Sequence, residues 1–146
     1  MKDILVFLAL ALSLPALAEM TAESPVVVGD AYFRATPPGQ SRTAGYFILH
    51  NRSRVDCDFM GADSPRASAL EIHEHRHSDG MMKMRRVNSL HLAAGATLRF
   101  KPGGYHLMAF GVSAPFQSGT AVPVTLDFGP CGMAQVEFAV RGFGGD

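Results

Sequence analysis

The sequence carries no excess of charge, no low-complexity tract and no internal repeat. Thirteen basic residues balance thirteen acidic ones, so nucleic acid and anionic membrane surfaces are not expected as partners. No window has the apolar period of a long amphipathic helix, which disfavours a helical bundle. Tryptophan is absent, and cysteine occurs only as Cys57 and Cys131. What remains is a neutral chain whose apolar residues fall in short runs.

The residue patterns of common enzyme classes are missing as well. No Ser lies in a nucleophile elbow and no carboxylate pair can be singled out, so a hydrolase has no support. The two cysteines are too far apart in sequence to form the C-x-x-C pair of a thiol reductase. We therefore expect a binding protein and not an enzyme.

The first eighteen residues have the form of a cleavable export signal. Lys2 precedes an apolar run from Ile4 to Leu14, and Ala16-Leu17-Ala18 supplies the small residues of a cleavage site. The run is shorter than the roughly 20 apolar residues that span a bilayer. We expect residues 1–18 to be removed as a signal peptide, and residues 19–146 to form one exported domain, most simply a monomer.

The cysteine pair has three interpretations. In an exported protein two cysteines favour a disulfide, which would stabilise the fold by about 4 kcal/mol through closure of a long loop. Two buried free thiols, or two ligands for a metal, are the alternatives.

Short β-rich segments alternate with turn signals such as PGG at 102–104 and GPCG at 129–132. The predicted strands are Val26–Val28, Ala31–Phe33, Ala44–His50, Val55–Gly61, Leu70–His73, Met82–Val87, Thr97–Phe100, Tyr105–Phe110, Val122–Phe128 and Ala134–Val140. Short strands at this spacing predict an all-β antiparallel sandwich or barrel.

Histidine and methionine are concentrated in one part of the chain. Five of the six histidines and four of the eight methionines lie between residues 73 and 108. In YHLMAF, strand alternation places His106 and Met108 on one face and Leu107 on the other. In ALEIHEHRH, the same rule places Glu71, His73, His75 and His77 together, and downstream Met82 and Met84 share a face while Met81 points away.

These side chains have an ordinary interpretation when taken singly, because Met is a common core filler and a lone His is usually a solvated surface group. Together they have the chemistry of a soft metal site. Thioether sulfur suits Cu(I) and is a poor ligand for hard cations, while imidazole accepts copper readily. Two His and two Met would hold Cu(I) with four neutral donors, a set that favours release by ligand exchange.

The spacing of four of these residues resembles a family signature. Ten residues separate His73 from Met84, twenty-one separate Met84 from His106, and one separates His106 from Met108. This pattern is similar to the His-x10-Met-x21-His-x-Met motif of the PCu(A)C copper chaperone family. The segments EIHEHRHSDGMMKMRRV, KPGGYHLMAF, AGYFILHN and VPVTLDFG also resemble family segments, so the likeness covers nearly all of residues 19–146.

The resemblance implies a cupredoxin-like, Greek-key β-sandwich that binds one Cu(I) per chain through His73, Met84, His106 and Met108. It further implies a periplasmic chaperone that delivers copper to the copper centre of cytochrome c oxidase, in some cases with a thioredoxin-like copper protein as partner. Some family members carry a His- and Met-rich C-terminal tail, whereas this sequence ends in RGFGGD.

Two questions stay open at this point. His75, His77, Met81 and Met82 belong either to a solvated loop around the turn SDG or to an auxiliary set of copper ligands. Tyr105 and the glycines before it are expected to shape the turn that presents His106.

Alternative functions remain within copper chemistry. A sequestering or resistance protein that holds copper without delivering it would need the same ligands as a chaperone. A blue-copper electron carrier is disfavoured, because it needs a Cys thiolate beside two His and no His follows Cys131. An oxygenase with an N-terminal histidine is disfavoured because the mature chain is expected to begin at Glu19.

Overall fold

The fold is a set of short strands with almost no helix. A computed structural model describes residues 24–143; the expected signal peptide and cleavage site lie outside this range. The described residues form the strands β1 (Val26–Arg34), β2 (Arg42–Asn51), β3 (Cys57–Phe59), β4 (Gly61–Asp63), β5 (Ala69–Ser78), β6 (Met81–Val87), β7 (Leu90–Leu92), β8 (Thr97–Phe100), β9 (Tyr105–Phe110), β10 (Ala121–Asp127) and β11 (Met133–Arg141), with one 3₁₀ turn, η1 (Gly129–Cys131). Within this range no helix is long and apolar enough to cross a membrane.

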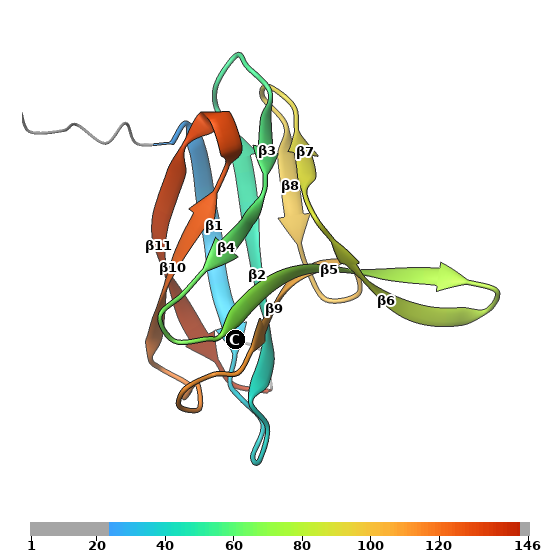
Figure 1. Cartoon of the computed structure of the whole chain (residues 1–146), viewed down its shortest axis with the longest axis vertical. Helices are drawn as coiled ribbons and strands as arrows, with labels where there is room; N and C mark the ends of the chain where they lie inside the picture. The colour runs from blue at the N-terminus through green and yellow to red at the C-terminus, as the bar shows by residue number, and fades with distance from the viewer. Residues whose placement is uncertain (1–23, 144–146) are drawn as a thin grey trace, which may run out of the picture.

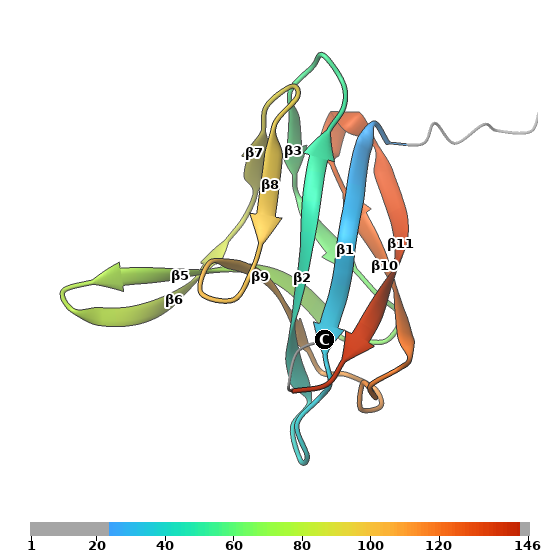
Figure 2. The ribbon, with the colours of Figure 1, turned by 180° about the vertical axis from the view of Figure 1, so that it is seen from behind.

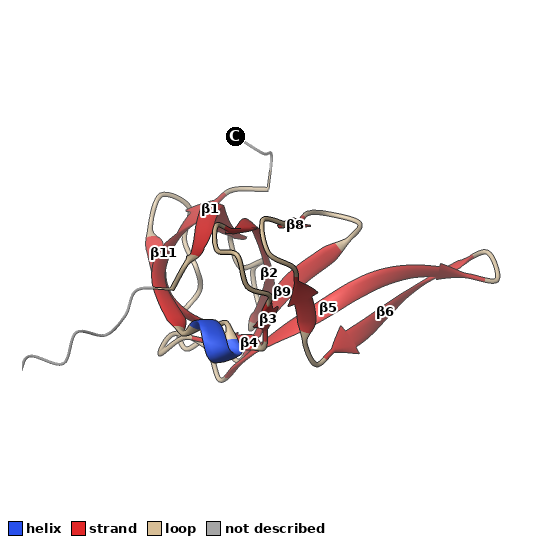
Figure 3. Ribbon diagram, turned by 90° about the horizontal axis from the view of Figure 1, so that it is seen from above, coloured by secondary structure: helices blue, strands red, loops and turns tan. Residues whose placement is uncertain are grey.

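Seven of the strands close into a flattened ring. Hydrogen-bonded neighbours run β4-β10-β11-β1-β2-β9-β5, and β5 returns to β4 through the pair Ala62 and Leu70. Figures 1 and 2 show these strands side by side around the core, and Figure 3 looks down on the ring from above. The predicted all-β sandwich is confirmed, and its pairing is antiparallel except between β1 and β11 and at the single β8–β9 contact.

Phenylalanine rings fill the interior of the ring. Phe47 stacks on Phe100 with ring centroids 4.2 Å apart, and Phe59 meets both rings edge-on. Phe33 is fully buried beside Gly45, where an added Cβ would lie 2.6 Å from the Phe33 ring. Glycine is therefore required at position 45 for the β2 backbone to approach this ring.

A disulfide closes one end of the sandwich. Cys57 on β3 is bonded to Cys131 in η1, with Cα atoms 5.7 Å apart. The bond confirms the first interpretation of the cysteine pair and removes both thiolates as metal ligands. Because it joins residues 74 positions apart, it stabilises the fold by about 4 kcal/mol on the chain-entropy estimate.

The β5–β6 hairpin extends from the sandwich as an arm (Figure 1). Its two-residue turn has positive φ at both central positions, 53° at Asp79 and 73° at Gly80. This is the geometry that an Asp-Gly turn favours, and it lets both strands pair right up to the turn, from Ile72 opposite Val87 to Ser78 opposite Met81. Of the two alternatives for His75, His77, Met81 and Met82, the loop is therefore wrong, since these residues lie in β5 and β6.

Candidate metal centre

The four predicted ligands come from three neighbouring strands. β5 lies between β6 and β9, and the three overlap where β5 leaves the sandwich and enters the arm. On the β9 side, His73 pairs with His106 and Glu71 pairs with Met108. On the β6 side, His75 pairs with Met84.

Cross-strand partners and residues two apart on one strand share a face of the sheet. His73, His106, Met108 and Met84 therefore share one face at the base of the arm. His75 lies on the same face, between Met84 on β6 and the start of β9.

The three imidazole rings lie close together. The ring centroids of His73 and His106 are 5.7 Å apart, and those of His75 and His106 are 4.9 Å apart. The ring of Phe110 lies 5.8 Å from His73 and supplies an apolar neighbour on the sandwich side.

Exposure changes steadily across the site. His106 is 2% exposed and the His73 side chain is 13% exposed, whereas Met84 on the arm is 51% exposed. The buried imidazole of His106 therefore forms the inner side of the site, and Met84 on the arm forms the side that faces solvent.

Hydrogen bonds leave one nitrogen free on each of the two predicted histidine ligands. His73 Nε2 donates to Glu71 Oε2 at 2.8 Å, and His106 Nδ1 donates to the Gly104 carbonyl at 3.3 Å. His73 Nδ1 and His106 Nε2 are buried and have no hydrogen-bond partner among the described residues. Buried polar atoms are nearly always paired, so these two nitrogens indicate a missing partner such as a metal ion.

Glu71 is positioned to support His73 as a ligand. Its second oxygen lies 3.3 Å from Arg86 Nη1. This ion pair helps to hold the carboxylate beside His73. A carboxylate that accepts the far N–H of a ligating imidazole orients the ring and raises the basicity of the other nitrogen.

The electrostatics of the site keep His106 neutral. Burial lowers the pKa of His106 below its ordinary value, and neighbouring His75 and His73 lower it further, against the opposing effect of the Gly104 hydrogen bond. Metal binding needs the neutral imidazole, so the lowered pKa favours the binding-competent form.

The turn before β9 positions His106. Gly104 N–H donates to the Lys101 carbonyl at 3.0 Å, and Gly103 has φ of 82°, a conformation suited to glycine. The Gly104 carbonyl accepts from both the His75 backbone N–H and His106 Nδ1. The glycines thus shape the turn as predicted, and they also tie the arm to β9.

The nitrogen and carboxylate donors of the described residues are not already closed around a metal position. Within residues 24–143, no group of three or more His, Cys, Asp or Glu side chains is already arranged to hold a metal ion. The methionine sulfurs on the same face are the remaining donors, and a set of imidazole and thioether suits Cu(I).

Comparison with known proteins gives the family. A family model described as "Putative lipoprotein LpqE-like" matches residues 26–140, which is most of the chain. The chain belongs to the LpqE-like family. It is 33% identical over 138 residues to "Putative lipoprotein Lxx21020" of Leifsonia xyli subsp. xyli, covering 92% of this chain and 82% of that protein.

Two solved structures have the same fold. The solution structure of CuI-DR1885 from Deinococcus radiodurans is 32% identical, with a TM-score of 0.67 over 90% of this chain and 89% of that one. The copper-bound PCuAC domain from PmoF2 is 21% identical, with a TM-score of 0.69 over 83% of this chain and 96% of that one. The resemblance to the PCu(A)C family is therefore confirmed.

Sequence reasoning missed three contributors to the site of this LpqE-like protein. Alternation places Glu71 on the same face as His73 but gives it no role. No sequence pattern points to Arg86 or to the Gly104 carbonyl as a hydrogen-bond acceptor. The two-residue spacing of Glu71 and His73 was the only signal that could have identified the first of these.

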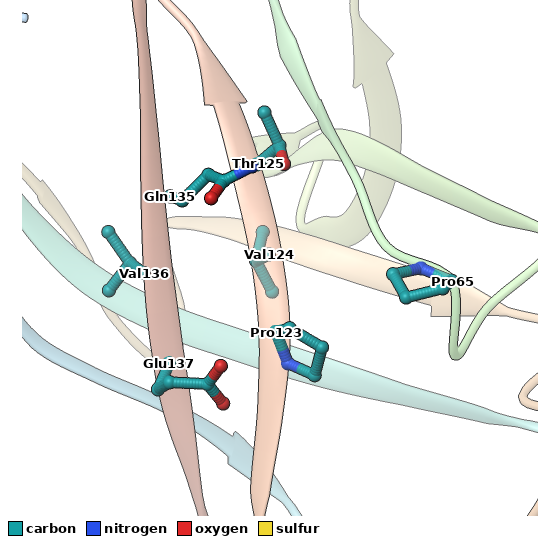
Figure 4. Close-up of a pocket in the computed structure, with 7 residues that line it drawn as sticks. All are labelled: Pro65, Pro123, Val124, Thr125, Gln135, Val136 and Glu137. Carbon is teal, nitrogen blue, oxygen red and sulfur yellow. The ribbon is translucent and has the colours of Figure 1, made fainter.

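The hollow of Figure 4 is a separate feature. It has a volume of about 450 Å³ and lies over β10 and β11 (Figure 4), lined by Pro65, Pro123, Val124, Thr125, Gln135, Val136 and Glu137. None of these side chains is a His, Met or Cys, so this hollow does not offer the donors of the predicted site.

Proposed function

We propose that this protein is a copper chaperone that holds one Cu(I) per chain through His73, Met84, His106 and Met108. The observation that carries the proposal is a pair of buried imidazole nitrogens that have no hydrogen-bond partner within residues 24–143, on a face that also presents two methionines. The Cu(I) form of the DR1885 relative adds support, because that protein is 32% identical over most of both chains.

The donor set suits transfer of the ion and not permanent storage. Four neutral ligands leave Cu(I) with its single positive charge, and no thiolate is present to lock it in place. Met84 is the most exposed of the four proposed ligands, at 51%, while His106 is buried at 2%. An acceptor protein approaching along the arm would displace Met84 first and leave the imidazoles to release the ion last.

The place of action is the periplasm, reached through the signal peptide at residues 1–18. The Cys57–Cys131 disulfide supports this placement, because structural disulfides persist in oxidising compartments. The acceptor is the copper centre of a cytochrome c oxidase subunit, with a thioredoxin-like copper protein as a further partner.

The binding part of the proposal is tested by titrating Cu(I) into purified protein under reducing conditions with a competing chelator. Met84→Ala and Met108→Ala should each weaken Cu(I) binding. Met81→Ala is the matched control, because Met81 is an exposed methionine of the same hairpin at 59% exposure, on the opposite face. Equal affinities for all four proteins would overturn the proposed ligand set.

Delivery and sequestration differ in their cellular consequence. A deletion strain should lose oxidase activity when copper is scarce and recover it when copper is added. Sensitivity confined to excess copper would contradict delivery and favour a copper-resistance protein.

A further inference from the structure

His75 has the same unusual feature as the two predicted histidine ligands. Its Nδ1 is buried and has no hydrogen-bond partner within residues 24–143. Its ring lies 4.9 Å from that of His106, closer than the 5.7 Å that separates His73 from His106. Three unpartnered nitrogens from three imidazoles therefore gather at the base of the arm.

The spacing of the rings is compatible with one shared ion. Imidazole nitrogens bound to a single metal at about 2.0 Å place their ring centroids about 4.5–6 Å apart. Both measured separations fall in this interval. The strands hold His73 opposite His106 and tie the His75 N–H to the Gly104 carbonyl, so the backbone keeps the three rings next to one another.

The other residues considered as auxiliary ligands lack this placement. His77 is exposed and pairs with Met82 farther along the arm, beyond the point where β9 begins. Met81 is on the opposite face, opposite Ser78. The structure thus separates His75 from the rest of the candidate set.

The chemistry of three imidazoles differs from that of two imidazoles and two thioethers. Cu(II) prefers nitrogen and oxygen donors, whereas thioether sulfur selects Cu(I). We infer that His75 is a third imidazole ligand, and that His73, His75 and His106 together bind Cu(II) at the site that holds Cu(I) through Met84 and Met108. The exposed side of the site leaves room for water to complete the coordination of Cu(II).

This inference rests on the proposed copper site and adds a second oxidation state to its cargo. Met84 and His75 are direct cross-strand partners, so the soft donor and the third imidazole approach the ion from the same side of the arm. A site built this way accepts copper in whichever oxidation state it arrives, with no electron transfer required on binding.

The test compares Cu(II) and Cu(I) binding in the wild-type protein, His75→Gln, His75→Ala and His77→Ala. His77 is the matched control, because it lies on the same strand and face but is exposed. Cu(II) affinity is measured by competition titration, and the number of nitrogen ligands by electron paramagnetic resonance. Cu(I) affinity is measured with a Cu(I)-specific chelator.

Both His75 variants should lose Cu(II) affinity and show two imidazole nitrogens in place of three, while Cu(I) affinity stays close to that of the wild type. Even a group that only hydrogen-bonds to a ligand contributes about 10- to 100-fold to metal affinity, so loss of a ligand should cost at least about tenfold for Cu(II). His77→Ala should resemble the wild type in every measurement.

Different failures point to different conclusions. If Cu(I) binds normally and the Cu(II) spectrum is the same in the wild type and both His75 variants, the inference is wrong and the chaperone proposal stands. The same holds if the wild type takes up no Cu(II). If the wild type binds neither ion, the proposed function itself fails.

Discussion

Substituting Glu71 by Gln tests how the protein strengthens a ligand without touching the metal. The Glu71 carboxylate accepts the Nε2–H of His73 at 2.8 Å, is held by Arg86 at 3.3 Å, and is 23% exposed. Gln keeps the shape of the side chain and an acceptor oxygen but removes the negative charge. The orientation of His73 should survive, and the basicity of its Nδ1 should fall.

The size of the effect follows from the hydrogen bond that is weakened. A hydrogen bond to a charged group contributes about 1.5–3 kcal/mol. Because Glu71 is about a quarter exposed to solvent, we take the lower end, about 1.5–2 kcal/mol, which corresponds to roughly 10- to 30-fold weaker copper binding. The measurement is a competition titration of Cu(I) against a chelator at fixed pH.

Glu74 provides the control. It is the other carboxylate of β5 near the site, it is 20% exposed, and it pairs with Arg76 at 3.1 Å on the opposite face of the arm. Glu74→Gln should leave copper affinity unchanged. The reasoning is refuted if Glu71→Gln binds copper as tightly as the wild type, or if Glu74→Gln weakens binding equally.

Three further predictions concern proton competition, packing and the disulfide. Because burial lowers the pKa of His106, Cu(I) affinity should be steady near neutral pH and fall only as acidification protonates this ring; an affinity that stays constant down to the pH at which the protein unfolds would argue against His106 as a ligand. Gly45→Ala should destabilise the fold by about 1–3 kcal/mol in urea unfolding, since its Cβ would overlap a buried ring, whereas Gly29→Ala, with open space around its Cβ, should not; equal stabilities would contradict the packing argument. Thiol titration of the unfolded, unreduced protein should find no free thiol at Cys57 or Cys131, and detection of two would contradict the disulfide.

The strands could be predicted from sequence where local patterns decide them. Thr97–Phe100 and Tyr105–Phe110 were predicted with the bounds they have, because β-rich residues lie between clear turn signals at both sites. β5 was predicted too short, since charged and His residues after Ile72 do not look like a strand. The stability of that segment comes from pairing with β6 across the Asp-Gly turn, which propensity does not measure.

The candidate site shows the same division. Alternation correctly grouped His106 with Met108 and His73 with His75, because it depends only on position along each strand. Which residues lie opposite one another depends on register between β5 and β9, strands separated by more than twenty-five residues in sequence. That register brings His75 beside His106 and Glu71 beside Met108, and no pattern within either strand contains it.

The most direct test of the copper site is X-ray absorption at the copper edge of the Cu(I)-loaded protein. The account predicts both sulfur and imidazole nitrogen around the ion, with sulfur lost on substitution of Met84 and Met108 together. A spectrum of the wild-type protein that contains only nitrogen and oxygen neighbours would contradict it.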